Sequence, residues 1–313
     1  MFNVYTESFN LRVRREATSS LRGTKQSRRI TIIILGLFII TAISLSAQNT
    51  RQPHICFPDM NAYNPADIPM DSSQNYYFSL SGDYKFIDNE KEIWNKPPIF
   101  FTNHIGRIKQ YDLYYSVSYL NDDYSFFNRN GLSLGVAYQL KWGKSSSIGF
   151  GTRMVFNFDI VNWNNFALSD KTGKSLLLCP DLDLGIEYKV KGFTLGVASQ
   201  NLIGYSTRKD NKGLIQNKRA VSAQASYLFN LGKNFKIAPL AMLYLERKLN
   251  YDVGVYFSIY EYVRLSDVFR INELRNITTL DVRIWQNLYL GLAFDFSLAV
   301  PDKNLSVMLR YAF

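Results

Sequence analysis

Two carboxylates have a spacing that could support chemistry. Asp181 and Asp183 are one residue apart in a segment that alternates apolar with polar positions, so both side chains lie on one face of a strand. Carboxyl groups placed this way could act as a general acid and a general base. They could also form a ladder of ion pairs with Lys189, Arg153 or Arg310, and we favour this structural role.

The two histidines, His54 and His104, do not indicate a metal site, because neither has metal-ligand spacing to a Cys, Asp or Glu. One Gly-x-Ser-x-Gly match occurs, at residues 131–135, but it lies within an alternating segment predicted to be a strand and not at a strand-to-helix turn. The sequence contains no phosphate loop or dinucleotide fingerprint. We therefore expect no catalytic residue, no metal ligand, no cofactor and no enzymatic activity. One enzymatic alternative is a membrane-embedded barrel that modifies lipids. Such an enzyme would need a Ser-His-acid set near the membrane edge, and His104 is the one histidine that falls in the predicted strands.

These residues belong to a chain that repeats one pattern from residue 75 onward. Segments of about ten residues alternate apolar with small or polar side chains, and turns or loops separate them. Such alternation indicates strands with two unlike faces, and no stretch after residue 48 shows convincing helical periodicity. The predicted strands lie near 75–87, 99–107, 111–120, 131–142, 147–159, 180–190, 192–200, 219–229, 234–246, 250–260, 261–270, 276–285, 287–298 and 304–313. The second and eleventh have the weakest patterns, and in the eleventh Arg264 and Asp267 break the alternation on both faces.

The last strand ends on an aromatic residue. Apolar side chains occupy every second position from Leu305 to Phe313, which is the final residue of the chain. A terminal aromatic that closes an alternating strand resembles the insertion signal of bacterial outer-membrane barrels. The remaining strands are consistent with such a barrel.

Loop lengths provide an independent argument, because outer-membrane barrels have short periplasmic turns and longer outside loops. With the C-terminus placed in the periplasm, the connections predicted on that side are short: 285–287, 260–261, 230–233, 191, 142–147 and 108–110. The connections predicted outside include the long ones: 299–303, 271–275, 247–249, 201–218, 160–179, 121–130 and 88–98. The division agrees with the barrel topology and with an even number of strands.

The two faces of the strands favour a membrane barrel over a soluble one. A soluble barrel or two stacked sheets would have to enclose an apolar core within about fourteen long strands, which are hard to close around a packed interior. The polar face carries Gly, Ser, Ala, Gln and paired charges, which suit a filled or wet lumen. Gly149 and Gly151 fall within a strand, where glycine marks a bend or a close approach. Aromatic residues near segment ends suit a membrane girdle: Tyr138, Trp142, Tyr188, Tyr227 and Tyr311.

The N-terminal residues divide into two further segments. Residues 1–47 contain Arg28–Arg29, the apolar run 30–45 and a cut site after Ala47, and are predicted to be a signal peptide with a long extension. They carry a net charge of +5, which leaves +5 of the chain's +10 and does not indicate a nucleic-acid partner. Residues 48–74 are rich in Pro, Asp, Asn and Met and are predicted to form a periplasmic lead-in or a plug in the lumen. The barrel comprises residues 75–313.

The cysteines are predicted to be two free thiols. Cys56 falls in the N-terminal segment and Cys179 at the end of the predicted outside loop 160–179. A disulfide between them would require the N-terminal segment to thread the lumen.

Short motifs spread along the chain resemble those of the PorP/SprF-type outer-membrane proteins of Bacteroidetes type IX secretion and gliding systems. The chain has Ala47-Gln48, then Asn64-Pro65-Ala66, where the family has Asn-Pro-Ala-Tyr-Ala-Gly. It has Pro180-Asp181-Leu182-Asp183-Leu184-Gly185, close to the family's Pro-Asp-Phe-Asp-Leu-Gly, and then the strand 192–198. The Tyr-Ala-Gly part is missing, and the family's Arg-Asn-Gln-Trp motif is degraded to residues 84–98.

The resemblance implies a non-enzymatic outer-membrane barrel of the type IX secretion and gliding machinery. Its expected partners are membrane lipid, secretion components and secreted adhesin-type cargo, whose export or surface attachment it would assist. The alternative function is a general porin or a channel for hydrophobic solutes. An open, solute-permeable lumen would favour that alternative, and a plugged one the first.

Overall fold

The computed structural model describes residues 60–69, 74–87, 99–108, 111–124, 127–143, 145–165, 172–204, 219–232, 234–246, 248–298 and 302–313. Strands make up almost all of this part of the chain. They are β1 (Tyr76–Ile87), β2 (Ile99–Ile108), β3 (Leu113–Tyr124), β4 (Phe127–Lys141), β5 (Ser146–Asn162), β6 (Lys174–Val190), β7 (Phe193–Gln200), β8 (Ala220–Tyr227), β9 (Phe229–Asn230), β10 (Phe235–Leu245), β11 (Leu249–Ile259), β12 (Val263–Arg270), β13 (Arg275–Trp285), β14 (Leu288–Ser297) and β15 (Asp302–Ala312). The short helical turns are η1 (Met60–Ala62), η2 (Trp163–Asn165) and η4 (Ile271–Glu273). No helix in the described ranges is both long and apolar enough to cross a membrane.

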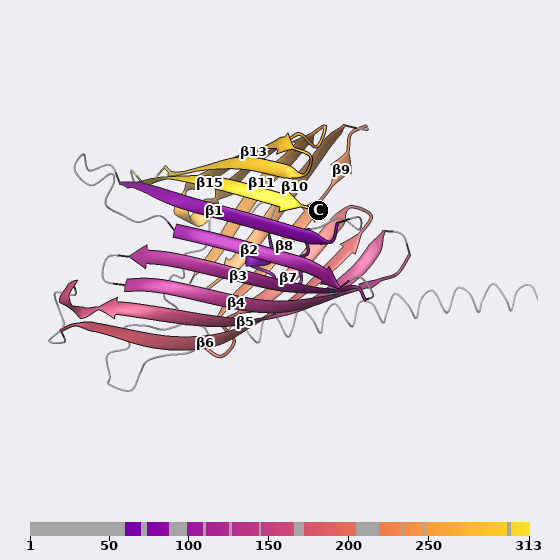
Figure 1. Ribbon diagram of the computed structural model, residues 1–313. Helices are drawn as coiled ribbons and strands as arrows, with labels where there is room; N and C mark the ends of the chain where they lie inside the picture. The colour runs from indigo at the N-terminus through magenta and orange to yellow at the C-terminus, as the bar shows by residue number, and fades with distance from the viewer. Residues whose placement is uncertain are drawn as a thin grey trace, which may run out of the picture. The chain divides into compact units, whose positions relative to one another are not determined.

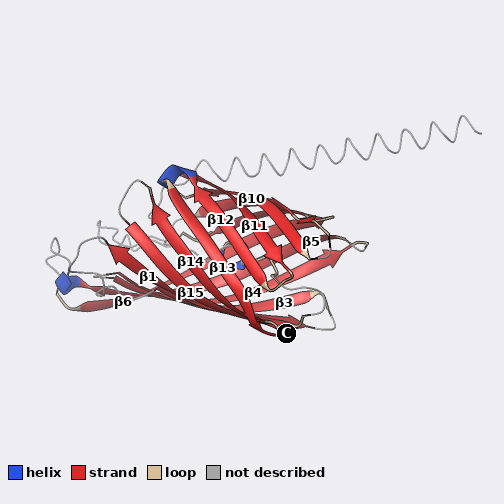
Figure 2. Cartoon of the chain, turned by 90° about the horizontal axis from the view of Figure 1, so that it is seen from above, coloured by secondary structure: helices blue, strands red, loops and turns tan. Residues whose placement is uncertain are grey.

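The strands form one closed antiparallel sheet (Figures 1 and 2). Each strand pairs with its neighbours in sequence, and β15 returns to β1 with a register from Tyr77–Ala312 to Ile87–Asp302. At this seam the amides of Asn75 and Tyr76 donate to the carbonyl of Phe313 at 2.6 and 2.8 Å. Because the sheet closes on itself, it has no edge strand, which suits a hydrocarbon environment that cannot solvate unpaired backbone groups.

β8 and β9 are one strand with a local break. Ser226 pairs with Leu240 and Phe229 pairs with Ile237 in one unbroken register, so Pro239 would lie opposite Tyr227. Proline has no N–H to contribute to the ladder, which explains the interruption. Counted as one strand, β8 and β9 reduce the 15 labelled strands to the 14 predicted.

The barrel turns its apolar side chains outward. In the middle of β4 the outward side chains are apolar and exposed, such as Leu134 and Val136 at 46% and 48%, whereas the inward-facing Ala137 is buried. Polar and charged side chains point inward and are buried, including Asp159, Asp183 and Asp295. An apolar exterior around a polar interior is the pattern of a transmembrane barrel. The predicted girdle residues Tyr138, Trp142, Tyr227 and Tyr311 are likewise exposed.

All fourteen predicted segments are strands, including the weak ones at 99–107 and 261–270. The observed strands differ most from the predicted ones at the start of β4, the end of β5 and the start of β6. β6 begins at Lys174 instead of residue 180. Three successive leucines, 176–178, interrupt the alternation there and conceal the strand. As a result, the prediction that Cys179 ends a loop is wrong: Cys179 lies in β6 and is fully buried.

We call one end of the barrel the C-terminal rim; it holds Phe313 and the turns at 191–192, 260–262 and 286–287. The opposite end, which holds η2 and η4, is the far rim.

Candidate functional site

Four glycines form a shallow floor on the inner face of three neighbouring strands. Gly149 and Gly151 lie on β5, Gly185 on β6 and Gly196 on β7. Gly151 pairs with Gly185, and Gly149 pairs with Glu187 beside it. Without side chains at these positions, another backbone can approach the strands closely.

The segment Asn64-Pro65-Ala66 occupies this floor. A Cβ added at Gly151 would lie 2.3 Å from the carbonyl carbon and oxygen of Pro65, and one at Gly185 would lie 2.0 Å from Asn64 Oδ1. A Cβ at Gly196 would lie 2.7 Å from Asn64 Nδ2. At Gly151 the nearest atoms are backbone atoms of the segment, so no other residue type fits there while the segment is in place. Close approach, the role predicted for Gly149 and Gly151, is therefore confirmed, and the segment and its floor are complementary.

Asn64 holds the segment in a tight turn and attaches it to the wall. Its Oδ1 accepts a hydrogen bond from the amide of Ala66 at 3.0 Å, a local turn that asparagine favours. Its Nδ2 donates to the carbonyl of Ile186 at 3.2 Å. The two ends of one side chain thus fix both the shape of the segment and its position on β6.

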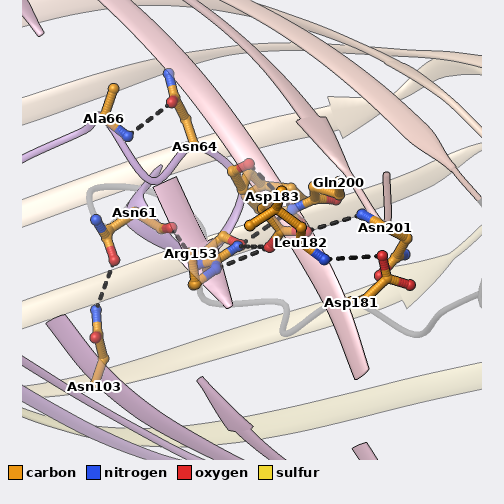
Figure 3. Close-up of polar contacts among 12 residues, drawn as sticks. Asn61, Asn64, Ala66, Asn103, Arg153, Asp181, Leu182, Asp183, Gln200 and Asn201 are labelled. Carbon is orange, nitrogen blue, oxygen red and sulfur yellow. Dashed lines mark hydrogen bonds and ion pairs between the residues drawn. The ribbon is translucent and has the colours of Figure 1, made fainter. Parts of the chain in front are cut away.

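Arg153 and Asp183 bind the preceding turn, η1 (Figure 3). Arg153 Nε donates to Asp183 Oδ2 at 2.9 Å, and both side chains are almost fully buried. The remaining guanidinium nitrogens donate to the carbonyls of Asn61 and Ala62, each at 2.9 Å. The carboxylate orients a guanidinium that donates to the carbonyls of a helical turn, and Gln200 Nε2 also donates to the carbonyl of Ala62 at 3.3 Å.

Contacts with strands on several sides place the segment in the lumen. Asn61 accepts a hydrogen bond from Asn103 of β2 at 3.4 Å, and Gln200 of β7 donates to the carbonyl of Tyr63 at 3.1 Å. The ring of Tyr63 packs edge-on against Tyr244 of β10, with ring centroids 6.3 Å apart. A segment that touches β2, β5, β6, β7 and β10 can only lie inside the closed sheet.

A charged cluster holds the other end of the segment. Lys189 Nζ lies 2.7 Å from Glu187 Oε1 and 3.6 Å from Asp67 Oδ1. Burial, and then the neighbouring Glu187 carboxylate, raise the pKa of Asp67 well above its ordinary value. Seating of the segment therefore shifts the Asp67 carboxyl toward its protonated form relative to the free group.

The predicted ion pairs are formed only in part. Asp183 pairs with Arg153 as predicted. Asp181 accepts backbone hydrogen bonds at Oδ1, from Leu182 at 2.9 Å and from Ile203 at 3.0 Å. Lys189 pairs with Glu187, as described above. Arg310 lies on β15 and pairs with Asp281 at 2.8 Å.

His104 lies on the outer face of β2, away from the lumen site. Its ring stacks on Tyr76 with centroids 6.1 Å apart, and its Nε2 is 3.4 Å from the hydroxyl of Tyr115. His54 and Cys56 lie outside the described residues. No group of three potential metal-binding side chains occurs in the part of the chain that the structure describes.

Sequence reasoning did not identify the partners Asn61, Asn103 and Gln200. Asn103 and Gln200 are inward-facing amides of the wall and Asn61 is an amide of the segment, and only the fold brings them together. The glycines carried a signal: they fall on the inward positions of neighbouring strands, where the alternating pattern otherwise holds larger side chains.

The fold and the site define a class of protein: a closed transmembrane barrel of the outer-membrane type whose lumen holds a segment of its own N-terminal region. The chain belongs to the PorP/SprF family of type IX secretion system membrane proteins, whose sequence model matches residues 60–307. The match begins at the lumen segment and continues into the final strand. The fold and the family together indicate the outer membrane.

Solved outer-membrane proteins share the fold at low sequence identity. Omp33 of Acinetobacter baumannii has a TM-score of 0.52 at 10% identity, over 77% of this chain and 98% of that one. The toluene transporter TbuX of Ralstonia pickettii has a TM-score of 0.52 at 10% identity, over 80% and 92%. The toluene transporter TodX of P. putida has a TM-score of 0.52 at 9% identity, over 81% and 94%. A comparison with curated proteins finds no match.

Proposed function

We propose that this barrel is a non-enzymatic component of the type IX secretion machinery that assists the export or surface attachment of adhesin-type cargo. The observation that carries the proposal is the family match, together with the place of the family's motifs in the structure. Asn64-Pro65-Ala66 and the strand Pro180–Gly185 are far apart in sequence, and they meet as segment and seat in the lumen.

The seated segment supports a plugged barrel rather than an open channel. It presents buried backbone to β5 and β6, and its ends are held by Arg153 at one side and Lys189 at the other. Solute transport through the space that the segment occupies would require these contacts to break. The likeness to transport proteins is a likeness of fold, at identities of about one residue in ten.

The remaining parts of the proposal concern export and partners. Residues 1–47 would direct the chain out of the cytoplasm and be removed, and residues 48–74 would carry the plug. The loops of the far rim would face the cell surface, where cargo and secretion components meet the barrel.

Surface display of type IX cargo tests the proposal. In a strain that lacks the gene, cargo proteins are expected to stay inside the cell or to be shed, and a plasmid copy of the full chain should restore their display. Fractionation of the outer membrane controls for general damage to the envelope. Normal display of every type IX cargo in the deletion strain would rule the function out.

A further inference from the structure

The C-terminal rim carries a large excess of positive charge. Its six turns connect β2 to β3, β4 to β5, β6 to β7, β9 to β10, β11 to β12 and β13 to β14. Taken with three residues on either side, these turns contain ten Lys or Arg and two Asp or Glu, a net charge of +8. The whole chain after residue 47 has a net charge of +5, so its other residues are acidic overall. Such a separation of charge indicates an electrostatic interaction surface at this rim.

Six of these cations point into the mouth of the barrel. They come from six strands: Arg107 on β2, Lys141 on β4, Lys189 on β6, Lys236 on β10, Arg264 on β12 and Arg283 on β13. Each lies an even number of residues from a buried inward side chain of its own strand, as Lys141 does from Ala137 and Arg283 from Asp281. Because side chains alternate along a strand, all six lie on the inner face. We call these six residues the cationic collar.

Two carboxylates of the rim pair with collar residues. Asp112 accepts hydrogen bonds from Arg107 at 3.0 Å and from Lys141 at 2.8 Å, and Glu261 pairs with Lys236 at 2.7 Å. The hydrogen bond from Lys141 lowers the pKa of Asp112, and that from Lys236 lowers the pKa of Glu261. Both carboxylates are therefore ionised near neutral pH, and the excess of eight positive charges already includes them.

The two arginines of the collar lie over aromatic rings. The guanidinium of Arg264 is 4.0 Å from the ring centroid of Tyr289, and that of Arg283 is 3.9 Å from the ring centroid of Tyr262. Arg264 also donates a hydrogen bond to the hydroxyl of Tyr289 at 2.9 Å. A tyrosine ring orients a guanidinium without cancelling its charge. These contacts hold two cations in place at the mouth.

The collar lysines remain accessible although each is part of an ion pair. The side chains of Lys141, Lys189 and Lys236 are 36%, 32% and 35% exposed. The nearby parts of the chain that precede β1 have few acidic residues to offer. Residues 48–59 contain one Asp and one Arg, and residues 70–73 contain one Asp. They cannot balance the charge of the rim.

The spread of the collar determines which kind of anion fits it. Lys189 on β6 and Lys236 on β10 are three strand spacings apart, about 14 Å at the usual separation of neighbouring strands. A single small anion can therefore contact one sector of the collar, whereas a polypeptide with several carboxylates can contact many. Lipid headgroups lie outside the wall, and the collar points inward. Asp112 already shows the expected contact, with one carboxylate between an arginine and a lysine.

We propose that the cationic collar binds an extended acidic segment of a partner protein that approaches the barrel from the periplasm. Carboxylates of this segment would bind the collar cations from several sides of the mouth, and the charge of the rim would speed the encounter. The inference rests on the proposed function, and it names the chemistry of the secretion component that meets the C-terminal rim.

Binding of a defined acidic peptide tests the collar directly. The purified full chain in nanodiscs is titrated against a labelled peptide in which Glu alternates with Ser, and the same peptide with Gln in place of Glu is the control. We expect fluorescence anisotropy to show saturable binding of the Glu peptide that weakens as salt is raised, and no binding of the Gln peptide. Equal binding of the two peptides, or no binding of the Glu peptide at low salt, would overturn the inference.

A matched pair of variants locates the binding. Lys141→Gln with Lys236→Gln removes two collar cations, whereas Lys174→Gln with Lys248→Gln removes two exposed cations of the far rim and changes the net charge equally. The collar variant is expected to bind the Glu peptide roughly five-fold more weakly, the effect of two lost exposed charge pairs. The far-rim variant should bind as the wild type does. Heat-modifiable migration on gels should show that both barrels fold, and equal loss of binding in the two variants contradicts the inference.

The same variants separate this inference from the proposed function. If deletion of the gene abolishes cargo display and the collar variant restores it as fully as the far-rim variant, the collar does not bind the partner and the secretion role stands. If deletion leaves display unchanged, the secretion role itself fails, and with it the partner named here.

Discussion

Arg153 links the barrel wall to the lumen segment through its guanidinium. Its guanidinium contacts Asp183 on one side and two backbone carbonyls of the segment on the other. The Asp183 carboxylate also accepts from the amide of Asn201, at 2.9 Å. A fully used hydrogen-bonding network of this kind, in a buried environment, specifies one arrangement of the segment.

Loss of one partner of this buried pair should destabilise the protein. Arg153→Met leaves the Asp183 carboxylate buried without its countercharge, and we expect a decrease of about 3–5 kcal/mol in the free energy of unfolding. The double variant Arg153→Met, Asp183→Leu should recover part of that loss. Denaturant unfolding of the barrel in phospholipid vesicles measures both. A single variant as stable as the wild type would show that the pair does not hold the segment.

Asp67 should make the seating of the segment depend on pH. The pKa of this carboxyl is raised in the folded protein, so the folded state binds more protons than the unfolded state at pH values between the two pKa values. The stability of the seated segment is therefore present at low pH and falls as pH rises through the folded pKa. Asp67→Asn, which stays neutral, should abolish this dependence.

Hydrogen exchange of the amides of Asn64 and Ala66 reports on the seating. The ratio of exchange rates in wild type and Asp67→Asn removes the intrinsic effect of pH on exchange. We expect the ratio to rise with pH, and a ratio constant across the range would refute the role of Asp67.

At the scale of elements, periodicity predicted the strands well because each strand has one apolar and one polar face. It failed at the outer end of β6, where residues 176–178 are all leucine. It could not reveal the segment's seat either, because Pro65 and Gly151 are 86 residues apart and meet only through barrel closure. The two family motifs are local, and their contact in space is a property of the fold.

β12 has a carboxylate within its outer face. Asp267 lies between the outward residues Leu265 and Phe269, and the hydroxyl of Thr278 on β13 donates to it at 2.6 Å. The hydrogen bond reduces the penalty of a charge on this face and does not remove it. The predicted break in the alternation at Asp267 is thus a real feature of the outer surface.

Replacement of this carboxylate should stabilise the barrel in a bilayer. For Asp267→Val we expect the free energy of unfolding in vesicles to rise by about 1–2 kcal/mol, somewhat less than the penalty for a basic residue at the midplane. Thr278→Val should have the opposite effect, because it leaves the carboxylate without its donor. A decrease for Asp267→Val would mean that this face does not contact lipid.

At the scale of the whole molecule, the segment connects strands of the wall that are not all neighbours in the sequence. It touches β2, β5, β6, β7 and β10, while β15 and β1 close the sheet. The lumen segment and the barrel wall therefore stabilise each other. Release of the segment should change permeability before it unfolds the barrel, because every ladder would remain paired.

Gly151→Val tests this link between seating and permeability. Its Cβ would meet the backbone of Pro65 at 2.3 Å, and backbone in a tight turn cannot move aside as a flexible side chain can. Overpacking of a buried contact typically costs about 1–3 kcal/mol, enough to increase the unseated population strongly. We expect wild-type protein in planar bilayers to conduct little and the variant to show larger and more frequent openings.

Gly131→Ala is the matched control, since its Cβ would lie 3.0 Å from the side-chain oxygen of Asn157, on a neighbouring strand and away from the segment. This variant should conduct as the wild type does. If both variants stay closed, another part of the chain blocks the lumen. If the wild type already conducts freely with the segment protected from exchange, the segment leaves a path beside it and the channel function regains support.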